Sequence, residues 1–185
     1  MEKNNYNRYF DLLKKVGDDV RIDEWARITR PDLLKIGSHV AIDMGVYISV
    51  GGIIQDYIHI GSNVIVLGGS SGELIMEDFT GISAGSTIVV VSDNFTKGLT
   101  NPIVPLEYRN LIGDKIIMRK FSLIGVNSVV LPNIEMKEGS VLGANSLLKC
   151  NAEPWTIYCG SPAKPIGKRD KKWILESAKK MGYEY

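Results

Sequence analysis

The sequence predicts a mostly β fold, a parallel β-helix of hexapeptide repeats, and the evidence for it is a period of six. Over residues 118–148 every sixth residue is aliphatic or methionine, and the residues four positions further on are mostly serine. The same period runs over residues 36–66 and 76–88. A helix repeats apolar residues about every 3.6 positions and a half-buried strand about every 2, so neither explains this period. It is typical of flat coils that each direct large residues inward and turn on small ones.

Fifteen inward positions carry this period, and none of them is polar. They are Ile36, Ile42, Ile48, Ile54, Ile60, Val66, Met76, Ile82, Ile88, Met118, Ile124, Val130, Met136, Leu142 and Leu148. Because 44% of the chain is hydrophobic, one run of this kind can arise by chance. Three runs with the same period indicate a repeat architecture.

Length and charge restrict the classes of function. The chain has 185 residues, enough for one domain with a real core. Its formal net charge of +1 gives no support for nucleic acid or an anionic membrane as main partner. Two cysteines do not make a disulfide framework and suit a reducing compartment. The start lacks the apolar run of a signal peptide and no stretch has transmembrane length, so we expect a cytoplasmic protein.

The chain is expected to begin with a capping helix, residues 1–17. Apolar residues over residues 5–16 form one stripe typical of a short amphipathic helix, which Gly17 would end. This helix would cover the open end of the coil stack, because terminal repeats must hide their apolar ends. Residues 18–150 then form the β-helix. Residues 67–74 interrupt its period with three glycines and two serines, which indicates a loop.

The largest interruption is residues 92–115, which contain two prolines and two glycines and no six-residue period. An irregular stretch of this length inside a regular repeat is usually functional, so we predict an excursion loop that carries site residues. Residues 151–185 complete the single domain. There we expect a final helix over residues 170–181, with Asp170 as its N-cap and Gly182 at its end.

The repeat with IGVNSVVLPN and LGANSLL, the long loop and the tail PWTIYCGSPAKPIGKR resemble the hexapeptide-repeat acyltransferases. Among these the chain is most similar to bacterial galactoside and maltose O-acetyltransferases and surface-polysaccharide sugar acetyltransferases. The resemblance covers roughly residues 36–169. It implies a left-handed parallel β-helix, an exception to the usual right-handed crossover. It also implies a homotrimer, with acetyl-CoA as co-substrate in the groove between neighbouring subunits.

The resemblance places the cofactor site along the last coils and the tail. In related enzymes the CoA arm follows backbone near the motif that stands here at residues 142–146, where small residues allow close approach. Cations of the tail would face the phosphates, although a solvated surface run is the alternative. The implied cofactor residues are Gly125, Gly143, Ala144, Ser146, Gly160, Pro162, Ala163, Lys164, Lys168 and Arg169. No metal is expected, because two histidines cannot supply the three ligands of a β-helical carbonic anhydrase.

The sequence departs from the resemblance at the catalytic base. The O-acetyltransferases have a histidine where the loop leaves the coil, and Asp93 stands in that position here. Asp93 is a candidate base if burial raises its pKa. Alternatively, no side-chain base is needed, because a neutral amine can attack a thioester when it is well positioned. A third alternative is that His59 of one subunit reaches a neighbour's site, although an outward-facing structural histidine is the simpler interpretation, as it is for His39.

The loop is expected to bind the acceptor sugar. Its polar and aromatic residues suit hydroxyl recognition and ring stacking, and Arg109 suits a nucleotide diphosphate. These candidates are Asn94, Asn101, Glu107, Tyr108 and Arg109. The predicted function is therefore an acetyl-CoA-dependent acetyltransferase acting on a sugar or nucleotide-linked amino sugar for surface-polysaccharide or glycan biosynthesis. The missing histidine keeps open one alternative, a catalytically inactive β-helical trimer that binds or scaffolds.

Overall fold

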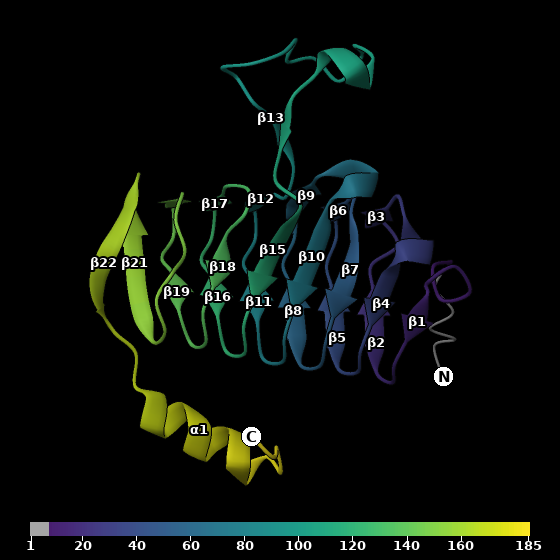
Figure 1. Cartoon of the computed structure of the whole chain (residues 1–185). Coiled ribbons are helices and arrows are strands. Elements are labelled where there is room, and N and C mark those ends of the chain that lie inside the picture. Colours follow the sequence, from purple (N-terminus) through teal and green to yellow (C-terminus); the bar gives the residue numbers. More distant parts are fainter. Residues whose placement is uncertain (1–7) are drawn as a thin grey trace.

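The computed structural model describes residues 8–185 and is a parallel β-solenoid with a sheet along each of three sides (Figure 1). The first sheet contains β1 (Lys15–Val16), β4 (Leu34–Ile36), β7 (Gly51–Ile54), β10 (Glu73–Met76), β15 (Lys115–Met118) and β18 (Glu135–Met136). The second contains β2 (Val20–Ile22), β5 (Val40–Ile42), β8 (Ile58–Ile60), β11 (Gly81–Ile82), β16 (Leu123–Ile124), β19 (Val141–Leu142), β21 (Thr156–Gly160) and β22 (Ala163–Lys168). The third contains β3 (Arg27–Ile28), β6 (Tyr47–Ile48), β9 (Ile65–Leu67), β12 (Thr87–Val89), β17 (Val129–Val130) and β20 (Leu147–Leu148).

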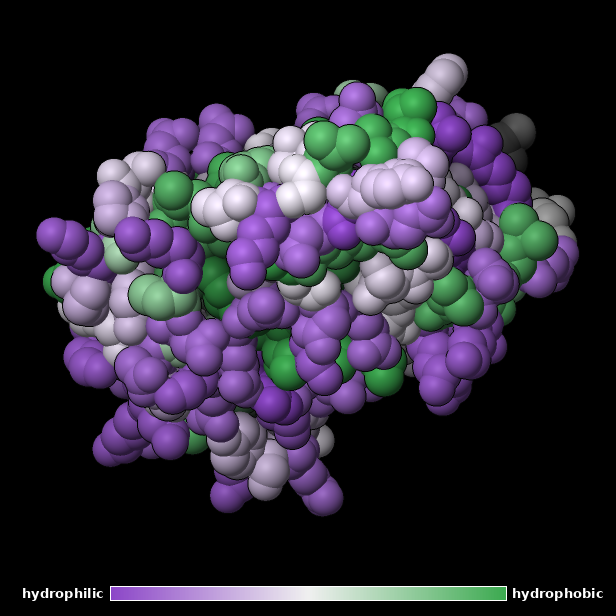
Figure 2. Space-filling view, turned by 45° about the horizontal axis from the view of Figure 1, so that its top comes forward, coloured by the Kyte–Doolittle hydropathy of each residue, from purple (hydrophilic) through white to green (hydrophobic). Residues whose placement is uncertain are grey.

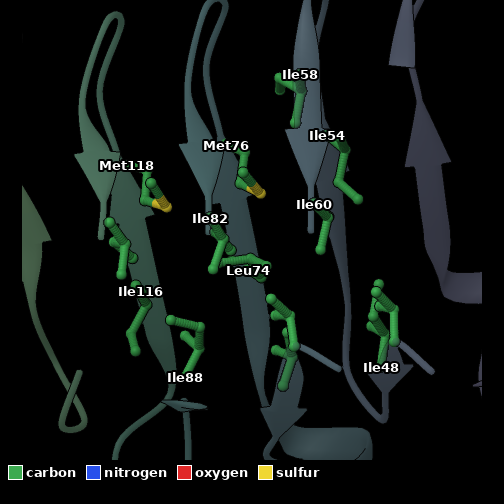
Figure 3. Packing of buried hydrophobic residues seen from close by; sticks show 14 of the residues in the cluster. Ile48, Ile54, Ile58, Ile60, Leu74, Met76, Ile82, Ile88, Ile116 and Met118 are labelled. Carbon is green, nitrogen blue, oxygen red and sulfur yellow. The ribbon is translucent and has the colours of Figure 1, made fainter. Parts of the chain in front are cut away.

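The predicted period of six is confirmed by the core. All fifteen inward residues are buried, each with at most 1% of its surface exposed. Consecutive coils stack in register, so that Ile54 lies beside Met76, and Met76 beside Met118 (Figure 3). Burying one such side chain stabilises the fold by about 1.5–3 kcal/mol. The core therefore fixes which side chains of every strand point outward.

The corners of the coils use left-handed backbone three residues after an inward residue. Between the second and third sheets these residues are Gly or Asn, the types that tolerate positive φ best. They are Gly45, Asn63, Gly85, Asn127 and Asn145, with φ between 52° and 72°. This choice keeps the corner beside the second sheet narrow.

The corner between the first and second sheets instead carries aromatic rings, which we call the aromatic ladder. Its members are His39, Tyr57, Phe79, Phe121 and Trp155. The ring centroids of His39 and Tyr57 are 4.7 Å apart, as are those of Tyr57 and Phe79. Stacking of about 0.5–1.5 kcal/mol per pair offsets the strain of bulky residues at positive φ.

The expected N-terminal helix is wrong for the described residues. Residues 8–14 form turns and β1 follows them, while residues 1–7 lie outside the described part. Tyr9 and Leu13 are nevertheless buried against the first coil. The Tyr9 hydroxyl accepts a hydrogen bond from the Ile28 amide at 3.0 Å and donates one to the Ala26 carbonyl at 3.1 Å. Residues 8–14 therefore cover the end of the coil stack with buried side chains, although their backbone forms turns and not a helix.

Three short 3-10 helices and one α-helix complete the described chain: η1 (Pro31–Leu33), η2 (Gly69–Ser71), η3 (Leu106–Tyr108) and α1 (Lys171–Lys180). The predicted excursion loop stands away from the solenoid on a two-stranded stem of β13 (Ser92–Asp93) and β14 (Leu111–Ile112) (Figure 1). The Asp170 carboxylate caps α1 by accepting from the Trp173 amide at 3.0 Å, as the sequence predicted. No helix of residues 8–185 is both long and apolar enough to cross a membrane.

Candidate active site

An ion pair between two predicted site residues closes the base of the excursion loop. Arg109 Nε donates to Asp93 Oδ1 and Arg109 Nη2 donates to Asp93 Oδ2, both at 2.9 Å. The antiparallel pairing of β13 with β14, in which Asp93 lies opposite Leu111, brings the two side chains together. The Asp93 side chain is 11% exposed and that of Arg109 is 16% exposed. Both oxygens of a shielded carboxylate are therefore held in one orientation.

This ion pair lowers the pKa of the Asp93 carboxyl below its ordinary value. The hydrogen bond from Arg109 is the main cause, and it outweighs burial, which by itself would raise the pKa. The same hydrogen bond raises the pKa of the Arg109 guanidinium. A general base at this position would need a raised pKa, so the condition stated for Asp93 as a base is not met. Arg109, which was expected to suit a nucleotide diphosphate, has two of its nitrogens engaged by Asp93.

The side chains of Asn94 and Asn101 bond within the loop instead of to this ion pair. The Asn94 side-chain oxygen accepts from the amide and hydroxyl of Thr96, and that of Asn101 accepts from the Ile103 amide at 3.0 Å. These two side chains therefore stabilise turns of the loop itself. Glu107 and Tyr108 are exposed in η3, directly before Arg109.

A groove of about 440 Å³ lies on the outward face of the second sheet, over β8, β11 and β16. Gly81 forms its floor, because it has no side chain between His59 on one neighbouring strand and Leu123 on the other. Ser83 and Gly125 line the groove at the corner between the second and third sheets. Its lining reaches from Tyr57 and Phe79 at one corner of the second sheet to Ser83 and Gly125 at the other.

His59 lies at the wall of this groove and is oriented by a carboxylate. Its Nε2 is 2.8 Å from Asp43 Oδ2, and its side chain is 61% exposed. Because an ionised carboxylate can only accept, Nε2 carries the hydrogen and Nδ1 faces elsewhere. The other histidine, His39, pairs with Asp19 and stacks in the aromatic ladder. The two histidines therefore have separate surroundings.

The predicted cofactor residues of the last coils lie at one corner, but Ser146 does not face outward. Ser86, Ser128 and Ser146 form an internal ladder, in which the Ser128 hydroxyl donates to the Gly143 carbonyl at 2.8 Å. The Ser146 hydroxyl accepts from the Gly160 amide at 3.0 Å. Ser146 is buried and packs within the corner, and its role toward the cofactor stays a prediction. Gly125, Gly143 and Ala144 remain beside the outer surface there.

The tail forms a hairpin of β21 and β22 with the cis Ser161–Pro162 bond in its turn. In this turn Gly160 pairs with Ala163, and the Lys164 side chain next to them is exposed. Lys168 donates to the Thr156 hydroxyl at 2.7 Å. Arg169 Nη1 donates to the carbonyl of Phe121, and burial lowers the pKa of this guanidinium. Arg169 therefore ties the tail to the aromatic ladder, and its role toward the cofactor phosphates stays a prediction.

Sequence reasoning missed Ser83, which lines the groove together with His59 and Gly125. Ser83 directly follows an inward residue, Ile82. The matching positions in neighbouring coils hold Gly61, Gly125 and Gly143. The sequence did contain a signal: Ser83 stands at a position where the neighbouring coils have glycine. Those glycines allow close backbone packing at this corner, so a serine there is an exception.

Comparisons with known proteins agree with this geometry. No family model matches the chain. A dTDP-4-amino-4,6-dideoxy-D-glucose acyltransferase from Escherichia coli is 37% identical over 169 residues, which cover 89% of this chain and 87% of that protein.

Among solved structures, AntD, an N-acyltransferase from Bacillus cereus in complex with dTDP-4-amino-4,6-dideoxyglucose and coenzyme A, superposes with a TM-score of 0.87. It is 30% identical and covers 92% of this chain and 91% of its own. A maltose O-acetyltransferase from Clostridium difficile is 15% identical, with a TM-score of 0.61 over 88% of this chain and 73% of its own. At that identity the likeness extends to the fold alone.

Proposed function

Because the chain belongs to the hexapeptide-repeat sugar acyltransferases, we propose that its acceptor is a nucleotide-linked amino sugar and that it acylates the amino group. A dTDP-linked 4-amino-4,6-dideoxyglucose is the first acceptor to consider, since the Escherichia coli relative is an acyltransferase of this sugar and the AntD complex contains it. The missing loop histidine supports an amine, because a neutral amine attacks a thioester without the activation that a hydroxyl needs.

The spacing of two residues identifies which side chains of this chain take part in the reaction. The solved structures of AntD include variants in which an aspartate, or a serine ten residues before it, is substituted. In this chain Ser83 precedes Asp93 by the same ten residues, and no other serine in the sequence is followed by aspartate at that spacing. We therefore assign Ser83 and Asp93 to the reacting groups.

The reaction forms a bond between the amine nitrogen and the acyl carbonyl carbon and breaks the carbon–sulfur bond, and the proton lost by nitrogen ends on the sulfur of CoA. Asp93, which its ion pair holds ionised, accepts a hydrogen bond from the amine and stabilises the positive charge that nitrogen gains during attack. The Ser83 hydroxyl donates to the carbonyl oxygen, where negative charge develops.

The co-substrate in this proposal is acetyl-CoA, lying along the groove of the second sheet. Gly81 leaves room for a thin pantetheine arm, and Gly125, Gly143 and Ala144 continue the narrow surface toward the tail. AntD is also solved with 3-hydroxybutyryl-CoA, so acyl groups longer than acetyl belong in the same assay. We place the reaction in the cytoplasm, as a step that modifies a sugar before it enters a polysaccharide or glycan.

We also propose a homotrimer whose sites are shared between subunits. The loop exposes large apolar side chains, among them Ile103 at 90% and Phe95 at 84%. More apolar residues are exposed on the third sheet and its corner, including Ile65, Leu67 and Val126. Figure 2 shows hydrophobic patches between polar side chains on one face of the molecule. Such surface is typical of a subunit interface.

Thiol release from acetyl-CoA, with dTDP-4-amino-4,6-dideoxyglucose as acceptor, tests this function. We expect turnover and an amide product. The matched control acceptor is dTDP-glucose, which has a hydroxyl in place of the amine and should give no turnover. Preferred turnover of the hydroxyl acceptor would replace N-acylation by O-acylation, and absence of both turnover and CoA binding would contradict the proposal.

A further inference from the structure

Arg109 is the one charged side chain of the described residues whose field and hydrogen bonds act on Asp93. Its nitrogens engage both carboxylate oxygens at 2.9 Å, which fixes the plane of the carboxylate as well as its position. The paired strand β14 consists of Leu111 and Ile112 and adds no charge. The state of Asp93 therefore depends on a single partner sixteen residues away.

The stem gives this pair a fixed frame. The Asn94 amide donates to the Asn110 carbonyl at 2.7 Å, directly beside the pair. The Leu99 amide donates to the Tyr108 carbonyl at 2.9 Å, so the segment before Arg109 is held to the other side of the loop. A backbone held on both sides brings Arg109 to Asp93.

Each carboxylate oxygen has two lone pairs, and Arg109 uses one on each. The remaining lone pairs can accept from a ligand. A carboxylate that is oriented and ionised before the ligand arrives costs no reorganisation when positive charge develops next to it. A free aspartate on a loop would lack this preorganisation.

We propose that Arg109 is a positioning residue, which fixes Asp93 as an oriented, ionised acceptor for the reacting amine and does not itself touch the substrate. This inference rests on the proposed function and reassigns Arg109, since its guanidinium serves Asp93 instead of a sugar phosphate. Lysine cannot replace it fully, because an ammonium is a point charge without the planar fork that engages both oxygens.

The test compares Arg109→Gln and Arg109→Lys with wild type by the pH profile of kcat/KM for amine acylation. Without Arg109, burial alone acts on Asp93 and raises its pKa, so the acid limb of the profile should move to higher pH. We expect Arg109→Gln to lower kcat/KM by roughly a hundredfold at neutral pH and by more at lower pH, with Arg109→Lys in between. KM for acetyl-CoA should stay within about twofold.

Arg119 provides the matched control. It also bridges carboxylates, at 2.8 Å to Glu77 and 2.5 Å to Glu135, but on the first sheet away from the stem. Arg119→Gln should leave the pH profile unchanged even if it lowers the melting temperature. An acid limb that does not move in Arg109→Gln, or a loss of rate equal at every pH, would overturn the proposal.

A second measurement separates this proposal from the proposed function. Because the pKa of Asp93 is lowered in the folded state, the pair stabilises the fold above the ordinary value of 3.8, and this stabilisation is lost as pH falls below it. The difference in Tm between wild type and Arg109→Gln should therefore shrink as pH falls from 6 to 3. If wild type does not acylate the amine, the proposed function fails, whereas a Tm difference independent of pH means that the ion pair itself is wrong.

Discussion

Ser83 is the side chain whose loss should slow acyl transfer without weakening the binding of acyl-CoA. It lies in the groove of the second sheet, and its amide is already used in the coil by the Ile124 carbonyl at 2.8 Å. Removal of one hydrogen-bond donor to a developing oxyanion costs roughly a hundredfold in rate. We expect Ser83→Ala to lower kcat by that order while the Kd for CoA, measured by calorimetry, stays unchanged.

Ser62 is the control for this substitution, since it lies at the same corner one coil earlier and outside the groove lining. Ser62→Ala should keep wild-type kcat. A large rise in the Kd for CoA with little change in kcat for Ser83→Ala would assign Ser83 to cofactor binding instead of to the transition state.

His59 is expected to contribute little to the chemistry, although it lines the same groove. Its Nε2 is engaged by Asp43, and the imidazole is largely in water. An amine acceptor that needs no general base leaves His59 without a catalytic task, so His59→Gln should retain kcat within about threefold. If instead kcat falls by more than a hundredfold while the Kd for CoA stays unchanged, His59 is the base.

At the scale of elements, the six-residue period of the sequence predicted the features that every coil repeats. The inward residues, the excursion loop and α1 with its Asp170 cap all follow from local pattern, because each coil repeats the same requirement. The N-terminal helix failed for a related reason. Its apolar stripe is real, since Tyr9 and Leu13 are buried, but burial against an existing coil end does not require helical backbone.

The candidate site was less predictable, because it depends on pairings that no period encodes. Asp93 and Arg109 meet only through the β13–β14 stem, and Arg169 reaches the carbonyl of Phe121, forty-eight residues away. A run of lysines and arginines in the sequence gave no sign of which cation would turn inward. The position of a residue along a coil thus predicts whether it is buried. The bonding partners of polar side chains can be identified only from the three-dimensional structure.

The aromatic ladder carries a prediction of its own about stability. Phe121 is buried at positive φ, with Phe79 at 5.2 Å and Trp155 at 6.1 Å between ring centroids. Phe121→Ala should destabilise by roughly 3–5 kcal/mol, as for other buried phenylalanines. Phe121→Asn also loses the ring but tolerates positive φ, so it should cost about 1 kcal/mol less. Urea unfolding measures both.

Tyr57→Ala is the control within the ladder, because Tyr57 also has a positive φ but is more exposed, so the loss of stability should be smaller. If Phe121→Asn is as stable as wild type, the backbone requirement and not the stacking determines the residues at this corner.

At the scale of the whole molecule, Ser83 and Asp93 lie on different corners of one subunit. Ser83 precedes the corner between the second and third sheets, and Asp93 follows the corner between the third and first, with β12 between them. A strand rises about 3.3 Å per residue, so crossing the third side separates the two residues by roughly 15 Å. One reacting amine cannot contact both in the same chain. A site that uses both therefore needs two subunits.

Mixed trimers test this arrangement directly. Ser83→Ala and Asp93→Ala should each be nearly inactive alone, yet a co-expressed mixture should contain sites that take Ser83 from one chain and Asp93 from its neighbour. In a ring with heterologous contacts and random assembly, about a quarter of the sites are complete, so about a quarter of wild-type activity should return. The particle should have a mass of about 61.5 kDa by light scattering, three chains of 20.5 kDa. A mixture that stays as inactive as its parents, while the trimer forms, would mean that each site takes both residues from one chain and that the loop bends back toward its own groove.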